Sequence, residues 1–446
     1  MNQPAQPVAP QASMKKPGKP RVLQCPACGG AITLRAVGLS VNVGCTQCGS
    51  LLDVASEDVR VLKKARLHQY EPRIPLGTRG VLQGVTWEVV GLLRKSSIAG
   101  VGERYSWDEY LLFNPYQGFR FLTEAQGHWT LYQIVKGPQE EADPTGFELF
   151  FQGKAEVDYV LGEFYWRVKK GDQAQLTDSI RPPYVRSVEK TADEIVTSLG
   201  RYLPAAEVGT AFGIAPDRLP RAVGVAPNQP SPYAAHLPSI MTVTVVGVAV
   251  ATAIQFAQAS TAKDQLVASD YFTLTAENRN DERISDPITL GPGQANVCID
   301  SHANLSNNWA ELNATLLNEV TLERRTVQLG MELYSGFEGG EHWSEGSPSA
   351  SGCFSAVPEG SYRLILDADA GELDWAGTGK SQAIGYQLRR DVSIWSNWLA
   401  LLLALLPYPL YLWLRHHSFE YARWSESDYM PAFYSSIQQS LSADDE

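Results

Sequence analysis

Two uncharged apolar stretches decide the predicted fold: VSIWSNWLALLLALLPYPLYLWL at 392–414 and IMTVTVVGVAVATAIQFA at 240–257. A helix needs about 20 apolar residues to cross a hydrocarbon core of about 30 Å. Both stretches approach or reach that length, and aromatic residues lie near both ends of 392–414, as in an interfacial belt. A buried core helix is the alternative for 240–257. The presence of a second such stretch favours two transmembrane helices, at 240–259 and 392–414.

The composition bounds the rest of the chain. Its 446 residues suffice for two or three domains, and its formal net charge is −12. Because nucleic-acid binding proteins present a basic face, we expect no nucleic-acid partner. Residues 1–20 are polar and rich in Pro, Gln and Ala, with no apolar core of a signal peptide, so they predict a disordered leader.

A four-cysteine motif follows the leader. Cys25 and Cys28 form one CxxC pair, and Cys45 and Cys48 form a second after sixteen residues, each pair followed by glycine. This spacing is typical of a tetrathiolate zinc site, so residues 21–56 predict a zinc ribbon with structural Zn²⁺. Four protein ligands leave no open position for water or substrate, so we expect a site that stabilises the fold. Nucleic-acid contact and redox exchange are the alternatives, and no basic or aromatic surface around the cysteines supports them.

Residues 74–213 predict a small β-barrel-like domain with short helices. Short β-rich runs with glycine at the turns are typical of a barrel or sandwich. We interpret Thr191–Glu194 as a capping box that begins a short helix carrying Ile195, Leu199 and Leu203, and we place a second helix at 205–212. Tryptophans that could face a ligand are Trp87, Trp107, Trp129 and Trp166, with packing inside the barrel as the alternative.

The block at 263–390 predicts a β-sandwich. Apolar residues alternate with polar ones in several segments, for example Ala310, Leu312, Ala314 and Leu316, as in antiparallel strands with one buried face. A pair of isolated cysteines, Cys298 and Cys353, is expected to form a disulfide if this block lies on an oxidising side; two unpaired buried thiols are the alternative. A proline-rich linker at 214–239 precedes the first span, and a polar tail at 415–446 follows the second.

Cysteine chemistry sets the predicted topology, because the distribution of Lys and Arg around the spans shows no clear bias. Thiolate ligands require reducing conditions, whereas a disulfide requires oxidising ones. The sequence therefore predicts a two-pass protein of a bacterial inner membrane, with both termini in the cytoplasm and an extracytoplasmic sandwich.

Several segments of the barrel region resemble bacterial membrane proteins built on a β-rich domain of unknown function, family 4178. The resemblance lies in GVTWEVVG (84–91), WDEYLL (107–112), GFRFL (118–122), GHW (127–129) and YVLGEFYW (159–166). A zinc-ribbon start and a two-span C-terminal half are also similar to that family. The resemblance implies no reaction and carries over no catalytic residue. It implies a part in envelope-stress or polyamine-linked membrane systems.

We therefore expect an integral membrane adaptor or sensor that contacts lipid and membrane or peripheral protein partners, and no enzyme. One alternative is a subunit of a membrane-associated enzyme, in which Glu109, Glu163 and His128 would form an acid–base cluster. Another is a receptor for a small cationic ligand, held by the aromatic side chains of the β-domain.

Overall fold

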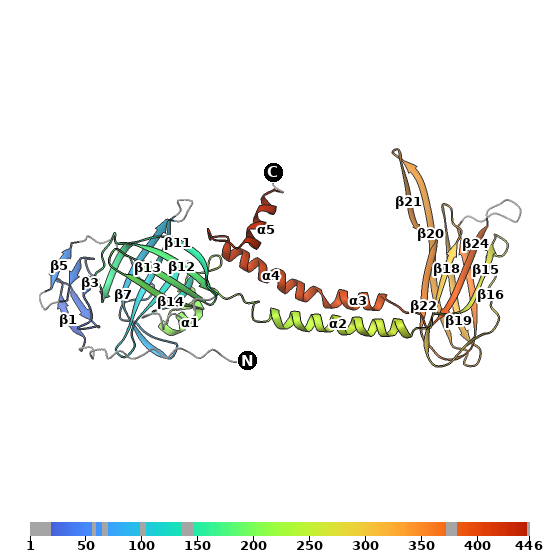
Figure 1. The fold of residues 1–446 in the computed structure, drawn as a ribbon, viewed down its shortest axis with the longest axis horizontal. Helices are drawn as coiled ribbons and strands as arrows, with labels where there is room; N and C mark the ends of the chain where they lie inside the picture. Colours follow the sequence, from blue (N-terminus) through green and yellow to red (C-terminus); the bar gives the residue numbers. More distant parts are fainter. Residues whose placement is uncertain are drawn as a thin grey trace. The chain divides into compact units, whose positions relative to one another are not determined.

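The computed structural model describes residues 19–55, 59–64, 70–98, 104–135, 146–371 and 381–443. The protein is mainly β and divides into two compact units, Met1–Pro238 with Leu410–Glu446, and Ser239–Pro409 (Figure 1). Each unit is described by itself. The leader predicted at 1–20 falls, up to residue 18, outside the described residues.

The first unit is built on one long antiparallel sheet. Twelve of its described strands are joined in the order β5-β4-β3-β11-β12-β13-β14-β10-β9-β8-β7-β6. The elements of this unit that precede the apolar helices are β1 (Arg21–Gln24), β2 (Ala31–Leu34), β3 (Asn42–Gly44), β4 (Leu51–Asp53), β5 (Arg60–Lys63), β6 (Arg79–Leu82), β7 (Val85–Ile98), β8 (Arg104–Asn114), β9 (Gly118–Ala125), β10 (His128–Ile134), β11 (Glu148–Phe164), β12 (Gln173–Arg181), β13 (Tyr184–Lys190), β14 (Ile195–Leu203), α1 (Ala205–Phe212) and the 3₁₀ turn η1 (Pro216–Arg218).

Pairing of β11 with β7 closes part of this sheet into a barrel. Strand β11 pairs with β12 through its first half and with β7 through its second, from Ala155↔Ser97 to Gly162↔Gly91. The closed path therefore runs through the eight described strands β7, β8, β9, β10, β14, β13, β12 and β11. Irregular register at Val89/Gly91 and Val157/Tyr159 bends the long strands, as bulges do in barrels. The predicted β-barrel-like domain is confirmed.

The four-cysteine ribbon extends the barrel sheet. Strand β3 pairs with the end of β11, and β4 and β5 add outward from β3. Gly44 permits this approach, because a Cβ there would lie 2.7 Å from the carbonyl oxygen of Val160. Gly162 adopts φ +82°, and a Cβ there would lie 2.3 Å from the carbonyl oxygen of Val90. The sequence predicted 21–56 and 74–213 as separate blocks, whereas the structure joins them in one sheet.

The helix predicted from Ile195, Leu199 and Leu203 is wrong, because these residues lie in strand β14 between β10 and β13. A spacing of four is also a multiple of two, so the same residues can share one face of a strand. The hydroxyl of Thr191 does accept hydrogen bonds from the backbone of Asp193 and Glu194, but in the turn that joins β13 to β14. The helix predicted at 205–212 is present as α1.

The second unit holds a β-sandwich. One sheet has the order β15-β24-β18-β22, and the other contains β16, β23, β19, β20 and β21, with β17 also paired to β23. Burial alternates residue by residue along β19, and the inward side chains of both sheets form one apolar core. The strands are β15 (Gln265–Leu274), β16 (Arg283–Ile284), β17 (Ile288–Leu290), β18 (Ala295–Ala303), β19 (Asn308–Asn318), β20 (Arg324–Glu338), β21 (Glu341–Ser347), β22 (Ser349–Val357), β23 (Gly360–Ala370) and β24 (Gln382–Arg390).

The apolar stretches form helices α2 (Leu237–Thr261), α3 (Ser396–Leu405) and α4 (Pro407–Trp424), and the tail adds α5 (Ala432–Ala443). Helix α2 and the α3–α4 segment are each long and apolar enough to cross a membrane, and no residue in the apolar window of α2 is buried. The second segment is interrupted at Leu406, between α3 and α4, where two prolines follow. It then continues as helix to Trp424, ten residues beyond the predicted end.

Candidate functional site

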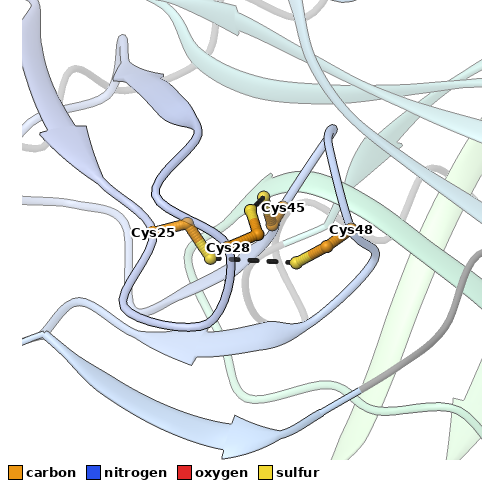
Figure 2. Close-up of side chains that lie close together, drawn as sticks. All are labelled: Cys25, Cys28, Cys45 and Cys48. Carbon is orange, nitrogen blue, oxygen red and sulfur yellow. Dashed lines mark hydrogen bonds between the residues drawn. The ribbon is translucent and has the colours of Figure 1, made fainter.

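The four cysteines of the CxxC pairs meet at one point of the ribbon. All four sulfur atoms lie within 4.8 Å of one another. The Sγ atoms of Cys25 and Cys48 are 3.8 Å apart, and those of Cys28 and Cys45 are 3.9 Å apart (Figure 2). The sequence predicted these residues as one set of ligands, and the structure brings them together.

This arrangement has the dimensions of a tetrahedral thiolate site. Zn–S bonds of about 2.3 Å in a tetrahedron place neighbouring sulfurs about 3.8 Å apart, close to the two short separations here. The donor set is four soft sulfur atoms, which suits zinc and does not suit calcium or magnesium. The residues therefore fit a structural metal ion.

The two cysteine pairs have the same backbone geometry. Gly29 N donates to Cys25 O, and Gly49 N donates to Cys45 O, each at 2.8 Å. Both glycines have positive φ, which lets each turn aim two thiols inward. Backbone N–H groups of Gly30 and Gln47 donate to the sulfurs of Cys28 and Cys45 at 3.4 Å. Such donors stabilise thiolate charge, so the local fold is prepared for a cation.

The barrel of the first unit encloses the second candidate site, a cavity of about 1350 Å³. Its wall follows the two-residue period of the strands. Alternate residues of β7 (Leu93, Lys95, Ser97) and of β10 (His128, Thr130, Tyr132) line it, for example. Since drug-sized ligand pockets occupy about 300–1,000 Å³, this cavity has room for an organic molecule.

An ion-pair triad lies in the wall of the cavity. The Nζ atom of Lys95 is 3.1 Å from a carboxylate oxygen of Glu109 and 3.1 Å from one of Glu189. Burial by itself disfavours the ammonium, but the two carboxylates outweigh it and raise the pKa of Lys95 above its usual value. Trp107 Nε1 also donates to Glu109 at 2.8 Å. Lys95 is therefore charged and fully engaged by protein groups.

Asp178 of β12 is the least compensated group of the cavity. Its Oδ1 atom is buried and has no hydrogen-bond partner. Burial raises the pKa of Asp178 to about 6, although Ser187 hydrogen-bonds to the carboxylate and lowers it in part. A buried carboxylate oxygen without a hydrogen-bond partner costs free energy, so its retention here calls for an explanation.

The four predicted tryptophans divide into two pairs. Trp107 and Trp166 line the cavity, together with other aromatic rings such as Tyr132. Trp87 and Trp129 are buried in an apolar cluster with α1 instead. On β10, His128 and Thr130 line the cavity, so the intervening Trp129 faces the other side of the sheet.

The predicted acid–base cluster is not assembled. The carboxylate of Glu163 accepts hydrogen bonds from the backbone of Arg35 and Ala36 and from Ser40 Oγ, which docks the ribbon against the barrel. Burial raises the pKa of Glu163 despite these donors.

Glu109 and His128 line the cavity but have separate partners. His128 contacts Tyr202 Oη through Nδ1 and Val223 O through Nε2, at 3.1 and 3.2 Å. Burial lowers the pKa of His128, which favours the neutral ring. Glu109 is engaged by Lys95 and Trp107, as above.

Two segments next to the apolar helices border the cavity, and sequence reasoning missed both. One belongs to the predicted linker, at Val223–Asn228 without Gly224, and the other is the start of the tail, Ser425–Asp428. Ser427 Oγ donates to Phe150 O of β11 at 2.6 Å, and Val223 N donates to Gln126 O at 2.9 Å. No compositional signal marks these residues, because both segments appear as ordinary polar connections.

Arg423, near the end of α4, fastens these two segments to each other. The side chain is 1% exposed, and its guanidinium donates to Pro227 O and to Gln229 O, both at 2.6 Å. Glu420, one turn earlier, pairs with it at 3.0 Å. The stretch that leads into α2 and the stretch that follows α4 are therefore held together at the edge of the cavity.

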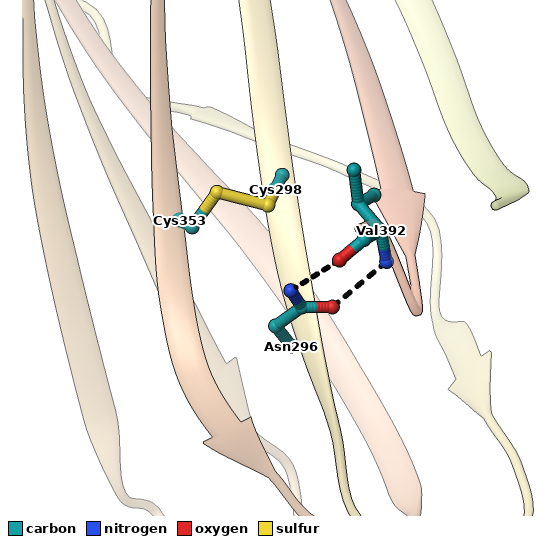
Figure 3. The surroundings of a disulfide bond; sticks show 4 residues. All are labelled: Asn296, Cys298, Cys353 and Val392. Atoms are coloured by element: carbon teal, nitrogen blue, oxygen red, sulfur yellow. Dashed lines mark hydrogen bonds between the residues drawn. A yellow bond between two sulfur atoms is a disulfide. The ribbon is translucent and has the colours of Figure 1, made fainter. Parts of the chain in front are cut away.

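In the second unit, the structure joins Cys298 of β18 and Cys353 of β22 in a disulfide (Figure 3). The two residues are direct cross-strand partners with Cα atoms 4.0 Å apart. Closing this loop stabilises the fold by about 4 kcal/mol in the chain-entropy treatment. Nearby, the amide of Asn296 exchanges two hydrogen bonds with the backbone of Val392 (2.7 and 2.8 Å), which fixes where the chain leaves the sandwich.

Comparison with known proteins places the barrel in context. Residues 75–205 match the model of a family described as Domain of unknown function (DUF4178). The match covers β6 to β14, which is the barrel with its first flanking strand, and supports the resemblance predicted for this region. The search of curated proteins gives no match.

Proposed function

We propose that this protein is an integral membrane adaptor or sensor, with the ribbon and barrel on one side of a membrane and the sandwich on the other. The observation that carries the proposal is the Arg423 contact. It ties the approach to α2 and the end of α4 to each other at the edge of the barrel cavity. We propose that this contact couples a change inside the barrel to both apolar helices.

Contacts of α2 with α3 and with the residues just before α3 support insertion as a helix pair. Trp398 Nε1 donates to Thr252 Oγ1 at 3.2 Å, and the Gln255 amide donates to Ile394 O at 3.2 Å. Apolar side chains such as Val243 and Leu403 remain exposed. Exposed apolar surface of this extent is unfavourable in water and favourable in lipid, where polar groups pair between helices.

The two kinds of cysteine chemistry support opposite sides. A reducing cytoplasm keeps the four ribbon cysteines as thiols that bind Zn²⁺ as a structural ion, and an oxidising compartment preserves the Cys298–Cys353 disulfide. Both termini are then cytoplasmic and the sandwich is extracytoplasmic, as in a bacterial inner membrane. The proposed partners are lipid and other membrane or peripheral proteins, and the family resemblance implies a part in envelope-stress or polyamine-linked systems.

Labelling of intact cells tests the topology. Single cysteines replace the exposed residues Lys190, in the barrel unit, and Glu341, in the sandwich, and an impermeant maleimide is added outside. We expect Glu341→Cys to be labelled and Lys190→Cys to be labelled only after lysis. The unchanged protein gives the background from the native thiols.

Two results would contradict the proposal. Labelling of Lys190→Cys in intact cells would contradict the cytoplasmic position proposed for the barrel unit. Recovery of the full chain in the supernatant after high-speed centrifugation of a detergent-free lysate would show that the protein is not inserted in a membrane.

A further inference from the structure

We infer that the barrel cavity is a binding site for a small organic cation, with an aromatic or aliphatic body, whose ammonium group pairs with Asp178. This inference goes beyond the adaptor role, because it concerns the interior of the first unit and holds whether or not α2 and α4 enter a membrane. It rests on the charge of one cavity, on its aromatic surface and on the Oδ1 atom of Asp178, which has no hydrogen-bond partner.

The described wall of the cavity is strongly acidic. Among its described lining residues nine carboxylates face three cations: Glu109, Glu156, Asp172, Asp178, Glu189, Asp193, Glu194, Glu426 and Asp428 against Lys95, Arg104 and Arg167. Each cation is already engaged. Lys95 pairs with two lining carboxylates, and Arg104 and Arg167 pair with Asp158 and Asp53 of other surfaces. A cavity with this excess of negative charge concentrates cations and repels anions.

Aromatic rings in the cavity wall are the second feature that suits an organic cation. Trp107 stands beside Tyr105 with ring centroids 5.9 Å apart, and Trp166 contacts Tyr165 at 4.7 Å. These rings line the same cavity as the carboxylates. Ring faces attract ammonium groups, and the rings also cover an apolar ligand body, so the combination selects an organic cation over a hydrated metal ion.

Asp178 gives the site its anchor. Its Oδ1 atom lacks a protein partner, whereas Glu109 and Glu189 are occupied by Lys95. An ammonium at this oxygen would satisfy both the charge and the missing hydrogen bond. The same pairing would favour the ionised form of Asp178. The ligand would thus supply the hydrogen bond and the positive charge that the buried carboxylate lacks in the protein alone.

A pair of matched fluorescent probes tests the inference on the full chain purified in mild detergent at pH 7.5. Dansylcadaverine carries a primary ammonium, and dansylglycine carries a carboxylate on the same fluorophore. We expect saturable energy transfer from protein tryptophan to dansylcadaverine, with an affinity at least tenfold greater than for dansylglycine. Partition of the dye into micelles is common to all samples and is measured with detergent alone.

Two substitutions locate the site. Asp178→Asn keeps the shape of the side chain and removes its charge, so we expect binding of dansylcadaverine to weaken about tenfold or more. Trp107→Leu removes a ring face and is expected to weaken binding about threefold or more. The matched control is Glu207→Gln on α1, an exposed carboxylate outside the cavity, which is expected to leave the affinity unchanged.

The inference is overturned if both probes bind equally, if neither binds, or if Asp178→Asn binds as tightly as the unchanged protein. Thermal unfolding of each variant shows that the barrel is intact, so lost binding is not mistaken for lost fold. Because these measurements need no membrane, their failure is distinct from failure of the topology experiment.

Discussion

The interior of the barrel and the interior of the sandwich are built from the same kind of strand and are opposite in character. In the sandwich, inward residues such as Leu312, Leu316 and Leu364 are fully buried and fill the space between the sheets. In the barrel, inward residues such as Lys95, Glu109 and Asp178 line a cavity. Alternation therefore shows that a strand has two faces, and the chemistry of the inward residues decides whether that face is packed or hollow.

The two units are also stabilised in different ways. The sandwich has a filled core and a disulfide between neighbouring strands. The barrel closes on itself and carries the ribbon, with its four clustered cysteines, along β11. A perturbation of one unit is therefore expected to leave the other unit intact, and the three predictions below test this independence from the largest effect to the smallest.

Removal of metal is expected to have the largest effect, and only on the first unit. Structural zinc contributes on the order of 10 kcal/mol to folding of small ribbons, so Cys45→Ser should unfold residues 21–55. Hydrogen exchange should rise there and at the edge of β11 that pairs with β3, while the sandwich stays protected. Metal content measured by mass spectrometry should fall from one ion per chain to none.

The matched control replaces Cys298 and Cys353 together by alanine. This variant should retain one metal ion and lose protection in the sandwich alone. Equal loss of metal in both variants would show that the four ribbon cysteines are not the ligands.

A pair of leucines compares the two interiors directly. Leu312 is fully buried in the sandwich, so Leu312→Ala is expected to lower the free energy of unfolding by about 3 kcal/mol. Leu176 lines the barrel cavity, so Leu176→Ala leaves little new void and should cost about 1 kcal/mol. Denaturant unfolding followed by hydrogen exchange assigns each loss to its unit. A cost at Leu176 equal to that at Leu312 would mean that the barrel interior is packed.

Titration of Asp178 is expected to give the smallest effect. Its pKa is raised from 3.8 to about 6, so the neutral form is favoured in the folded state and stability falls as the pH rises from 4 through 6. Asp178→Asn should therefore raise the unfolding midpoint at pH 7.5 and leave it unchanged at pH 4. The charged groups that act on the pKa of this carboxyl are Glu109 and Glu189, which raise it, and Lys95, which lowers it.

The gain at pH 7.5 is expected to be about 1 kcal/mol, the lower end of the cost of burying an unpaired polar group. Thermal unfolding of the barrel at the two pH values measures it, with Asp270→Asn in the exposed part of the sandwich as the control. An equal gain at both pH values would show that charge is not the cause.

The sequence alone determined the features that depend on local spacing. Two CxxC pairs placed four thiols together, because a tight turn fixes the direction of each pair. Period-two alternation around Leu312 predicted a strand with one buried face, and the length of the apolar stretches predicted α2 and the α3–α4 segment. The same reasoning failed at Ile195, where a spacing of four fits a helix and a strand equally well.

Only the tertiary structure decided what those elements enclose. Pairing of β11 with β7 is a contact between distant strands, and it alone turns alternate residues such as Asp178 toward a common cavity. The same closure separates Trp107, in the cavity, from Trp129, behind the sheet. The contact of Arg423 with the linker joins segments almost 200 residues apart. Such relations follow from the order in which strands pair, and no local pattern in the chain specifies that order.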